Sequence, residues 1–192
     1  MLQRIQVTIQ GVTPLICNKF TDAKAQAATE GTRGMRADDG EPYEQAESRL
    51  YLGLKGKPMI PQPNVLRCII DGGIFHKVGK TKVTTQKTSQ IPAAAKIEGI
   101  EIPIKSKNGW RVDTRAVRIP STGGRILCHR PCFDDWELSF TIVLDTEVIP
   151  VKLLRQILDD AGKRIGLGDF RPACKGPFGT FVVTKWVIEE AA

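Results

Sequence analysis

The sequence predicts an α+β fold, and two kinds of periodicity within its 192 residues support this class. Several short segments place apolar residues at every second position, which is typical of half-buried β-strands. Two longer segments repeat apolar residues every three or four positions, which is typical of amphipathic helices. The length and the hydrophobic content of 41% suit a single domain over residues 1–192, with inserted loops rather than two separate cores.

The first predicted strand covers residues 3–10, where isoleucine and valine alternate with polar residues. We place a long flexible loop at residues 18–57, because the composition changes there to Ala, Gly, Thr and mixed charge. Residues 46–54 within this loop could form a short helix or strand. The first predicted helix covers residues 65–76, and a close approach of another backbone would explain its glycine pair, Gly72-Gly73.

The middle of the chain predicts three strands. Residues 96–104 alternate apolar and polar positions, and residues 110–119 can return as the hairpin partner of that strand. After a break at Ser-Thr-Gly-Gly, residues 125–130 can form another short strand.

The last third carries the clearest elements. Residues 136–144 place large apolar side chains on one face of a strand. Residues 150–165 predict an amphipathic helix, and the proline at its start suits a first helical turn. Residues 180–188 predict a terminal strand rich in β-branched and aromatic residues.

The predicted order is therefore strand, helix, strand pair, strand, helix, strand. With insertions, this is the order of a ferredoxin-like (RRM-like) βαββαβ antiparallel sheet that carries a basic β-hairpin or loop insertion. If both helices lie on one face of the sheet, the other face remains free for a ligand.

Positive charge is concentrated in one part of the chain. The net charge is +7, and residues 77–130 contain twelve Lys or Arg against three Asp or Glu, so this stretch carries +9 and the remainder −2. We therefore treat residues 77–133 as a basic insertion whose field favours a polyanionic partner. A solvated surface that only maintains solubility is the alternative.

The five cysteines are scattered along the chain. We expect no signal peptide, and no apolar run approaches the ~20 residues of a membrane span. The expectation is a cytoplasmic location with reduced thiols. Cys128-His129-x-x-Cys132 lacks the second pair of ligands that a zinc site needs, so we expect no metal and no other cofactor.

The most informative segment, residues 166–179, lies between the second predicted helix and the last strand. It carries Arg171, Lys175 and four glycines at positions 166, 168, 176 and 179. Glycine adopts positive φ and lets the backbone approach a polyanion, so successive N–H groups could form an anion-binding concavity. The segment is not a Walker loop, because it lacks the Gly-Lys-Ser/Thr ending and follows a helix. A glycine-rich turn from helix to strand is the alternative.

This glycine-rich segment resembles the C-terminal loop of the RAMP superfamily, the CRISPR-associated RNA-binding and RNA-processing proteins, in which G-x-G…G-x-G precedes a closing strand. Residues 57–67 resemble a second motif of RAMP backbone subunits, "PxIPgssLkgalR". The matching positions are Pro58, Ile60, Pro61, Val65 or Leu66, and Arg67. Gln62-Pro63-Asn64 stands where Gly-Ser-Ser is usual, which puts contacts by serine hydroxyls in doubt.

The resemblance implies a ferredoxin-like palm, a protruding basic insertion, and side-by-side assembly along a strand. A phage or mobile-element relative that uses the same fold fits the motifs as well as a CRISPR component does. We therefore predict sequence-tolerant binding of single-stranded RNA or DNA, with RNA favoured, along the backbone. The protein would act as repeated subunits, in a homo-oligomer or in a multi-protein ribonucleoprotein or nucleoprotein filament, with no membrane partner.

The candidate binding residues are the cations and glycines of these segments, two residues of the proline motif, and one aromatic platform. They are Asn64, Arg67, Lys80, Lys82, Lys87, Trp110, Arg111, Arg115, Arg118, Arg125, Arg130, Gly166, Gly168, Arg171, Lys175, Gly176 and Gly179. Trp110 is preferred over Phe75 and Phe133 for stacking, although it could equally cap a hairpin. Binding of one phosphate chain requires the basic insertion and the glycine-rich segment to converge on one concave surface.

We expect no catalysis, because no paired carboxylates or Ser/His/Asp arrangement is evident. Two alternatives remain: a metal-independent endoribonuclease that uses His76, and a phage structural or protein-interaction module whose basic face binds an acidic protein. His129 could touch a phosphate. Asp38 or Asp39 could support cleavage by analogy with backbone subunits, but Asp-Asp-Gly is also a common turn.

Overall fold

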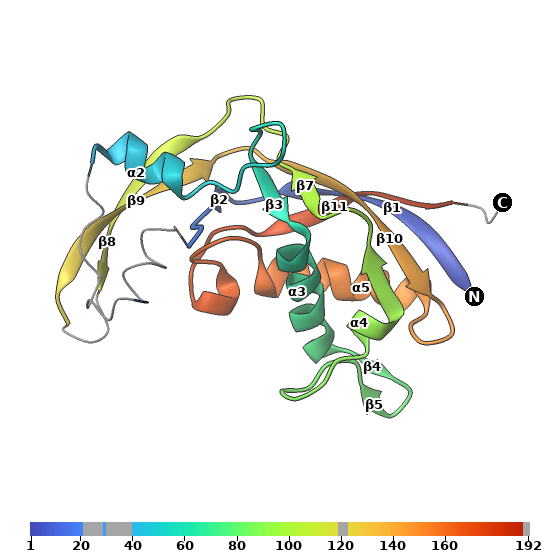
Figure 1. The fold of residues 1–192 in the computed structure, drawn as a ribbon. Coiled ribbons are helices and arrows are strands. Elements are labelled where there is room, and N and C mark those ends of the chain that lie inside the picture. Colours follow the sequence, from blue (N-terminus) through green and yellow to red (C-terminus); the bar gives the residue numbers. More distant parts are fainter. Residues whose placement is uncertain (21–28, 30–39, 119–122, 190–192) are drawn as a thin grey trace.

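The main sheet has four strands in the order β11-β1-β10-β6, and all neighbouring strands are antiparallel. These strands are β1 (Leu2–Gly11), β6 (Ala95–Ile97), β10 (Glu137–Asp145) and β11 (Phe181–Glu189). The structure is a computed structural model, and it describes residues 1–20, 29, 40–118 and 123–189 (Figure 1). The α+β class with antiparallel sheets is confirmed.

Two helices, α3 (Gln62–Gly72) and α5 (Val151–Asp160), cover one face of this sheet (Figure 1). A 3-10 turn (Gly73–Phe75) extends α3, and a π-helical turn (Ala161–Ile165) extends α5. The alternating apolar side chains of β1 and β10 are buried beneath them. A Cβ at Gly72 would lie 2.8 Å from the carbonyl oxygen of Ile157, so the expected close approach at this glycine is confirmed.

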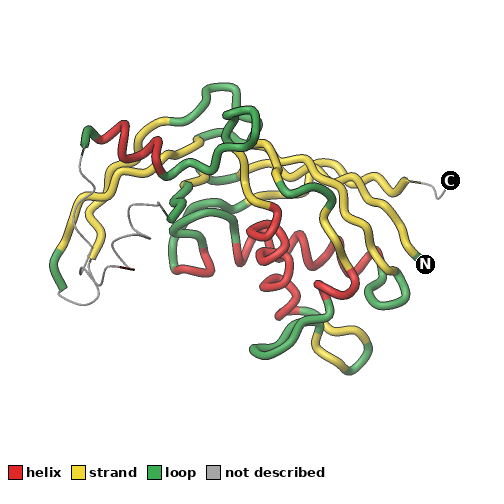
Figure 2. The backbone as a smooth tube through the Cα atoms, viewed as in Figure 1, coloured by secondary structure: helices red, strands yellow, loops and turns green. Residues whose placement is uncertain are grey.

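A second sheet, in the order β2-β9-β8, extends from the end of the main sheet as an arm (Figure 2). It consists of β2 (Leu15–Ile16), β8 (Arg111–Arg118) and β9 (Arg125–Phe133). The helix α2 (Pro42–Ser48) packs on this arm through Tyr43, whose ring stacks on Trp110.

Two short strand pairs, a one-turn helix and a 3-10 turn complete the described fold. β3 (Met59–Pro61) pairs with β7 (Glu101–Pro103), and β4 (Lys77–Val78) pairs with β5 (Thr81–Lys82). A one-turn helix, α4 (Ile91–Ala94), precedes β6, and a 3-10 turn (Pro172–Cys174) lies inside the glycine-rich segment. No helix in the described ranges is both long and apolar enough to cross a membrane.

Two sequence-based predictions of strand pairing need correction. Residues 111–118 pair with residues 125–133 and not with the strand predicted at 96–104. That predicted strand is divided at Gly99, where φ is +79°, so that its first part joins the main sheet and its second part pairs with β3.

Two predicted segment boundaries also change. The basic insertion at 77–133 is not one protrusion, because β6 lies inside this range and pairs with β10 in the main sheet. The loop predicted at 18–57 contains α2, since Ala46 is buried and anchors a helix there. Residues 21–28 and 30–39 lie outside the described residues.

Candidate nucleic-acid interface

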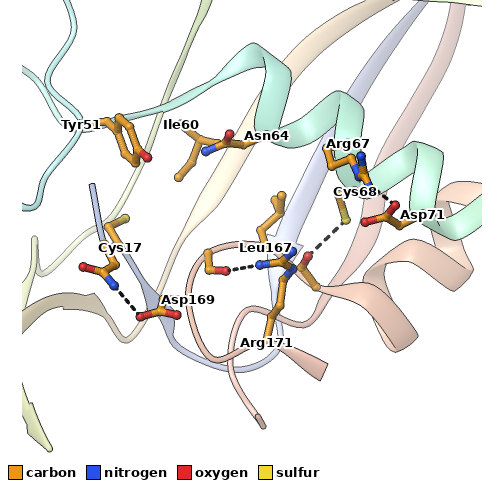
Figure 3. A pocket seen from close by; sticks show the side chains of 13 residues that line it. Cys17, Tyr51, Ile60, Asn64, Arg67, Cys68, Asp71, Leu167, Asp169 and Arg171 are labelled. Carbon is orange, nitrogen blue, oxygen red and sulfur yellow. Dashed lines mark hydrogen bonds and ion pairs between the residues drawn. The ribbon is translucent and has the colours of Figure 1, made fainter. Parts of the chain in front are cut away.

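A cleft of about 260 Å³ lies between α3, the end of β2 and the glycine-rich segment 166–179. Figure 3 shows side chains of α3 on one wall and side chains of the glycine-rich segment on the facing wall. The predicted binding residues that line it are Asn64, Arg67, Gly166, Gly168 and Arg171. The fold therefore brings the two short motifs of the sequence together at one site.

Two arginines supply the positive charge of the cleft. The Nε of Arg67 donates to Asp71 at 2.9 Å, but 71% of the Arg67 side chain remains exposed. Arg171 donates one N–H to the carbonyl oxygen of Gly168 at 3.0 Å. It forms no ion pair with any residue that the structure describes. Both guanidinium groups therefore retain donors for an anion in the cleft.

Asp169, at the edge of the cleft, is already held by three donors, one of which is the N–H of the next residue, Phe170. It accepts hydrogen bonds from Asn18 at 3.0 Å and from Arg130 at 2.8 Å. These contacts compensate its negative charge. They also fix the glycine-rich segment to Arg130 of β9 and to Asn18. Asn18, Tyr51 and Asp169 all line the cleft, and nothing in the sequence marks the first two as site residues.

The glycines of this segment pack against protein backbone. A Cβ at Gly168 would overlap the carbonyl of Ile16, one at Gly176 that of Phe170, and one at Gly179 that of Leu167. Gly166, Gly168 and Gly179 also have φ between +69° and +76°. The tight turn from helix to strand therefore explains the glycines, as the alternative interpretation of the sequence proposed.

Most N–H groups of the segment donate inside the protein, which leaves little of the expected anion-binding concavity. The donating residues are Gly166, Leu167, Asp169, Phe170, Cys174, Lys175, Gly176, Phe178 and Gly179. A phosphate in the cleft would therefore be bound by side chains such as Arg171 rather than by a row of backbone amides, while Lys175 is exposed but does not line the cleft.

The arginines of the β8–β9 arm differ in their availability. Arg130 is 5% exposed and lies between Asp169 and Asp113, so it cannot reach an external phosphate and is removed from the candidate set. Arg115 is held by Asp113 at 2.8 Å, and its guanidinium lies 4.7 Å from the ring centroid of Phe178.

Arg111 forms two hydrogen bonds with Asp134, at 2.7 and 2.8 Å, and this arginine lowers the pKa of the Asp134 carboxyl. By contrast, Arg118 of β8 and Arg125 of β9 are exposed and lie opposite each other in the strand register. Among the described residues, neither forms an ion pair. These two cations remain available at the end of the arm.

Trp110 stacks on Tyr43 with ring centroids 4.9 Å apart, and it packs against the hydrophobic core. Its ring therefore covers an apolar surface, and a base could not stack on the face that Tyr43 occupies. Of the other two aromatic candidates, Phe133 is buried at 2% exposure, and Phe75 is exposed but has Arg164 over its ring and does not line the cleft.

Three predicted lysines lie away from the cleft. Lys80, Lys82 and Lys87 are exposed in and after the β4–β5 hairpin, at the far end of α3 from the β8–β9 arm (Figure 1). The predicted convergence of all cations on one surface is therefore wrong for these lysines. Of the predicted basic insertion, only the base of the arm contacts the glycine-rich segment, through the buried Arg130, and none of its cations lines the cleft.

The two histidines considered for catalysis or phosphate contact, His76 and His129, do not line the cleft. Nε2 of His76 lies 2.8 Å from Asp160, which also pairs with Arg164, so this cluster connects the end of α3 to α5. Nδ1 of His129 lies 2.8 Å from the hydroxyl of Thr114. Asp38 and Asp39 lie outside the described residues, and within the described ranges no group of three metal-ligating side chains was found.

Comparison with known proteins gives weak structural matches. No family model and no curated protein matches the chain. One chain of the type III-B Cmr-beta bound to cognate target RNA superimposes with a TM-score of 0.48 at 13% identity, over 100% of this chain and 62% of that one. Cmr6 from Pyrococcus furiosus gives a TM-score of 0.46 at 8% identity, over 95% and 98%. This chain spans less than two thirds of the first matched chain, and such values establish neither its family nor its function.

Proposed function

We propose that this protein binds single-stranded nucleic acid, with a preference for RNA, along the cleft between α3 and the glycine-rich segment. The binding is sequence-tolerant, because the cations of the cleft are the arginine side chains of Arg67 and Arg171, which suit the phosphates that every strand carries. The protein acts as a RAMP-like subunit of a nucleoprotein assembly in the cytoplasm and does not cleave the strand.

One observation carries this proposal. Arg67 and Arg171 come from distant parts of the sequence, belong to the two motifs that resemble RAMP proteins, and line the same cleft. A guanidinium group binds phosphate oxygens through two parallel hydrogen bonds, which makes a pair of arginines in one cleft well suited to a phosphate chain.

The arrangement of the main sheet supports a ferredoxin-like palm. In chain order, β1, β6, β10 and β11 occupy the second, fourth, third and first positions of the sheet, and a helix follows β1 and β10. This matches the βαββαβ pattern in which both helices cover one face. The open face carries polar side chains such as Gln6, Thr8 and Ser139 rather than aromatic ones, which favours the cleft over this face as the binding site.

The test is the affinity of an unstructured, fluorescently labelled RNA, measured by anisotropy over a range of salt concentrations. Replacing both cleft arginines (R67Q with R171Q) should weaken binding at least about tenfold, since hydrogen bonds to charged groups contribute about 1.5–3 kcal/mol each. The slope of log K against log salt should become shallower by about 1.4, because two phosphate contacts are lost.

Arg155 provides the matched control, because it also pairs with the aspartate one helical turn later but lies outside the cleft. R155Q should bind RNA like the wild type. Absence of RNA binding by the wild type, or an unchanged salt slope in the double variant, would contradict the proposal. RNA should remain intact after prolonged incubation with the wild type, because the proposed protein does not cleave the strand.

A further inference from the structure

We propose that Phe170 is the platform on which an unpaired base stacks. This inference rests on the proposed function and adds a base contact beside the phosphate contacts, since Phe170 does not itself line the cleft but stands between two lining residues, Asp169 and Arg171. Phe170 has φ of +51°, in the left-handed region, and its side chain is 39% exposed. A bulky aromatic residue rarely adopts this conformation, and strained residues of this kind gather at ligand-binding sites.

The surrounding segment holds the ring in place. The N–H of Phe170 donates to the carboxylate of Asp169 at 2.8 Å, and its carbonyl accepts the N–H of Phe178 at 3.3 Å. Gly176 lies so close that a Cβ there would approach Cδ2 of Phe170 to 2.6 Å. The absence of a side chain at Gly176 therefore makes room for the ring, which is supported by protein on this side.

A second aromatic ring extends this support. The centroids of Phe170 and Phe178 are 6.0 Å apart with an interplanar angle of 37°, and Phe178 is 8% exposed. On Phe178 lies the guanidinium of Arg115. Phe170 is thus the exposed member of a cluster that joins the glycine-rich segment to the β8–β9 arm.

Two cations follow Phe170 within five residues of the chain. Arg171 follows it directly and lines the cleft, while Lys175 is exposed with φ of +62°. An aromatic face close to phosphate-binding cations is the arrangement with which single-strand binders hold a strand without reading its sequence. Bases inside a duplex already stack on their neighbours, so this platform favours unpaired strands.

The probe is an unstructured RNA that contains 2-aminopurine, whose fluorescence is quenched when it stacks. We expect wild type and F170W to quench it, and F170L to lose the quenching and bind about 5- to 100-fold more weakly. An otherwise identical abasic strand should bind wild type and F170L equally, because it offers phosphates without bases. F75L, at an exposed phenylalanine outside the cleft, should match the wild type.

The outcomes separate this inference from the proposed function. If wild-type protein binds RNA and F170L binds it equally well with unchanged quenching, the platform is overturned and the phosphate site stands. If F170L loses affinity equally for the abasic and the base-containing strand, Phe170 only shapes the segment, and the inference is again overturned. If the wild type binds neither strand, the proposed function itself fails.

Discussion

Arginines of the β8–β9 arm that look equivalent in the sequence have different roles in the structure. Arg130 is buried between two aspartates, Arg111 pairs with Asp134 at the surface, and Arg118 is exposed without a recorded ion pair. Burial decides which of them can act on a ligand, because a desolvated, paired charge stabilises the fold and cannot reach an external phosphate.

Replacing Arg130 should therefore reduce stability much more than replacing an exposed arginine of the same arm. R130Q leaves the carboxylates of Asp113 and Asp169 partly uncompensated and should lower the free energy of unfolding by about 3 kcal/mol. R118Q should change it by less than about 0.5 kcal/mol. Urea unfolding followed by circular dichroism checks both variants. Equal stabilities of the two would refute the structural role of Arg130.

Glycine positions allow a similar comparison. Gly179 and Gly109 both have φ of +69°, but a Cβ at Gly179 would overlap the carbonyl of Leu167, whereas nothing lies within 4 Å at Gly109. G109A should cost about 1 kcal/mol for the left-handed conformation alone. G179A should cost about 2 kcal/mol more, because the backbone must move to relieve the overlap. Thermal unfolding measures both, and similar melting temperatures for the two variants would contradict the close packing of this segment.

At the scale of elements, the turn before β8 is held by one carboxylate. Asp135 accepts hydrogen bonds from the backbone N–H of Lys107 at 2.7 Å and the hydroxyl of Ser106 at 3.1 Å. The N–H of Lys107 is the main reason that the pKa of Asp135 is lowered from its ordinary value of 3.8. This turn directs the chain from β7 into the arm.

The lowered pKa of Asp135 determines how its contribution to the stability of the protein changes with pH. Because the folded state has the lower pKa, Asp135 stabilises the protein fully above its ordinary value, and this contribution is lost as the pH falls through the folded value. The wild type should therefore unfold at a higher temperature than D135N at neutral pH, and the difference should shrink below about pH 4. Melting curves between pH 3 and 7 test this, and a difference that stays constant down to pH 3 would contradict it.

Elements whose buried face is encoded locally could be predicted from the sequence. The strands at 3–10, 136–144 and 180–188 and the helix at 150–165 are confirmed within a few residues, because each repeats apolar side chains with the period of its own structure. The partner of residues 111–118 could not be predicted, since antiparallel pairing is chosen by contacts between distant segments.

The candidate site could also be predicted only in part, because sequence motifs identify residues but do not show which of them are buried. Arg67 and Arg171 were identified from two short motifs, and the fold brings them to one cleft. The burial of Arg130 and the covering of Trp110 by Tyr43 depend on segments that are remote in sequence, so composition alone could not reveal them. Phe170 stands inside the predicted glycine-rich segment, but its exposure and its positive φ are visible only in three dimensions.

At the scale of the whole molecule, positive charge is divided between two ends of the fold. The β4–β5 hairpin, which carries lysines, lies at one end of α3, and the β8–β9 arm, which carries arginines, extends away from the other end (Figure 1). These two groups of cations lie outside the cleft, so only a strand long enough to extend beyond it could meet them. The cleft is thus the central section of the proposed path.

The most direct test of this account maps where the strand lies. RNA substituted with 4-thiouridine is bound to the wild-type protein, crosslinked with long-wavelength light, and the attached peptides are identified by mass spectrometry. We expect crosslinks in residues 62–72 and 166–179, with further crosslinks along the β8–β9 arm. Crosslinks confined to the open face of β1, β10 and β11, with none in α3 or the glycine-rich segment, would contradict the central claim.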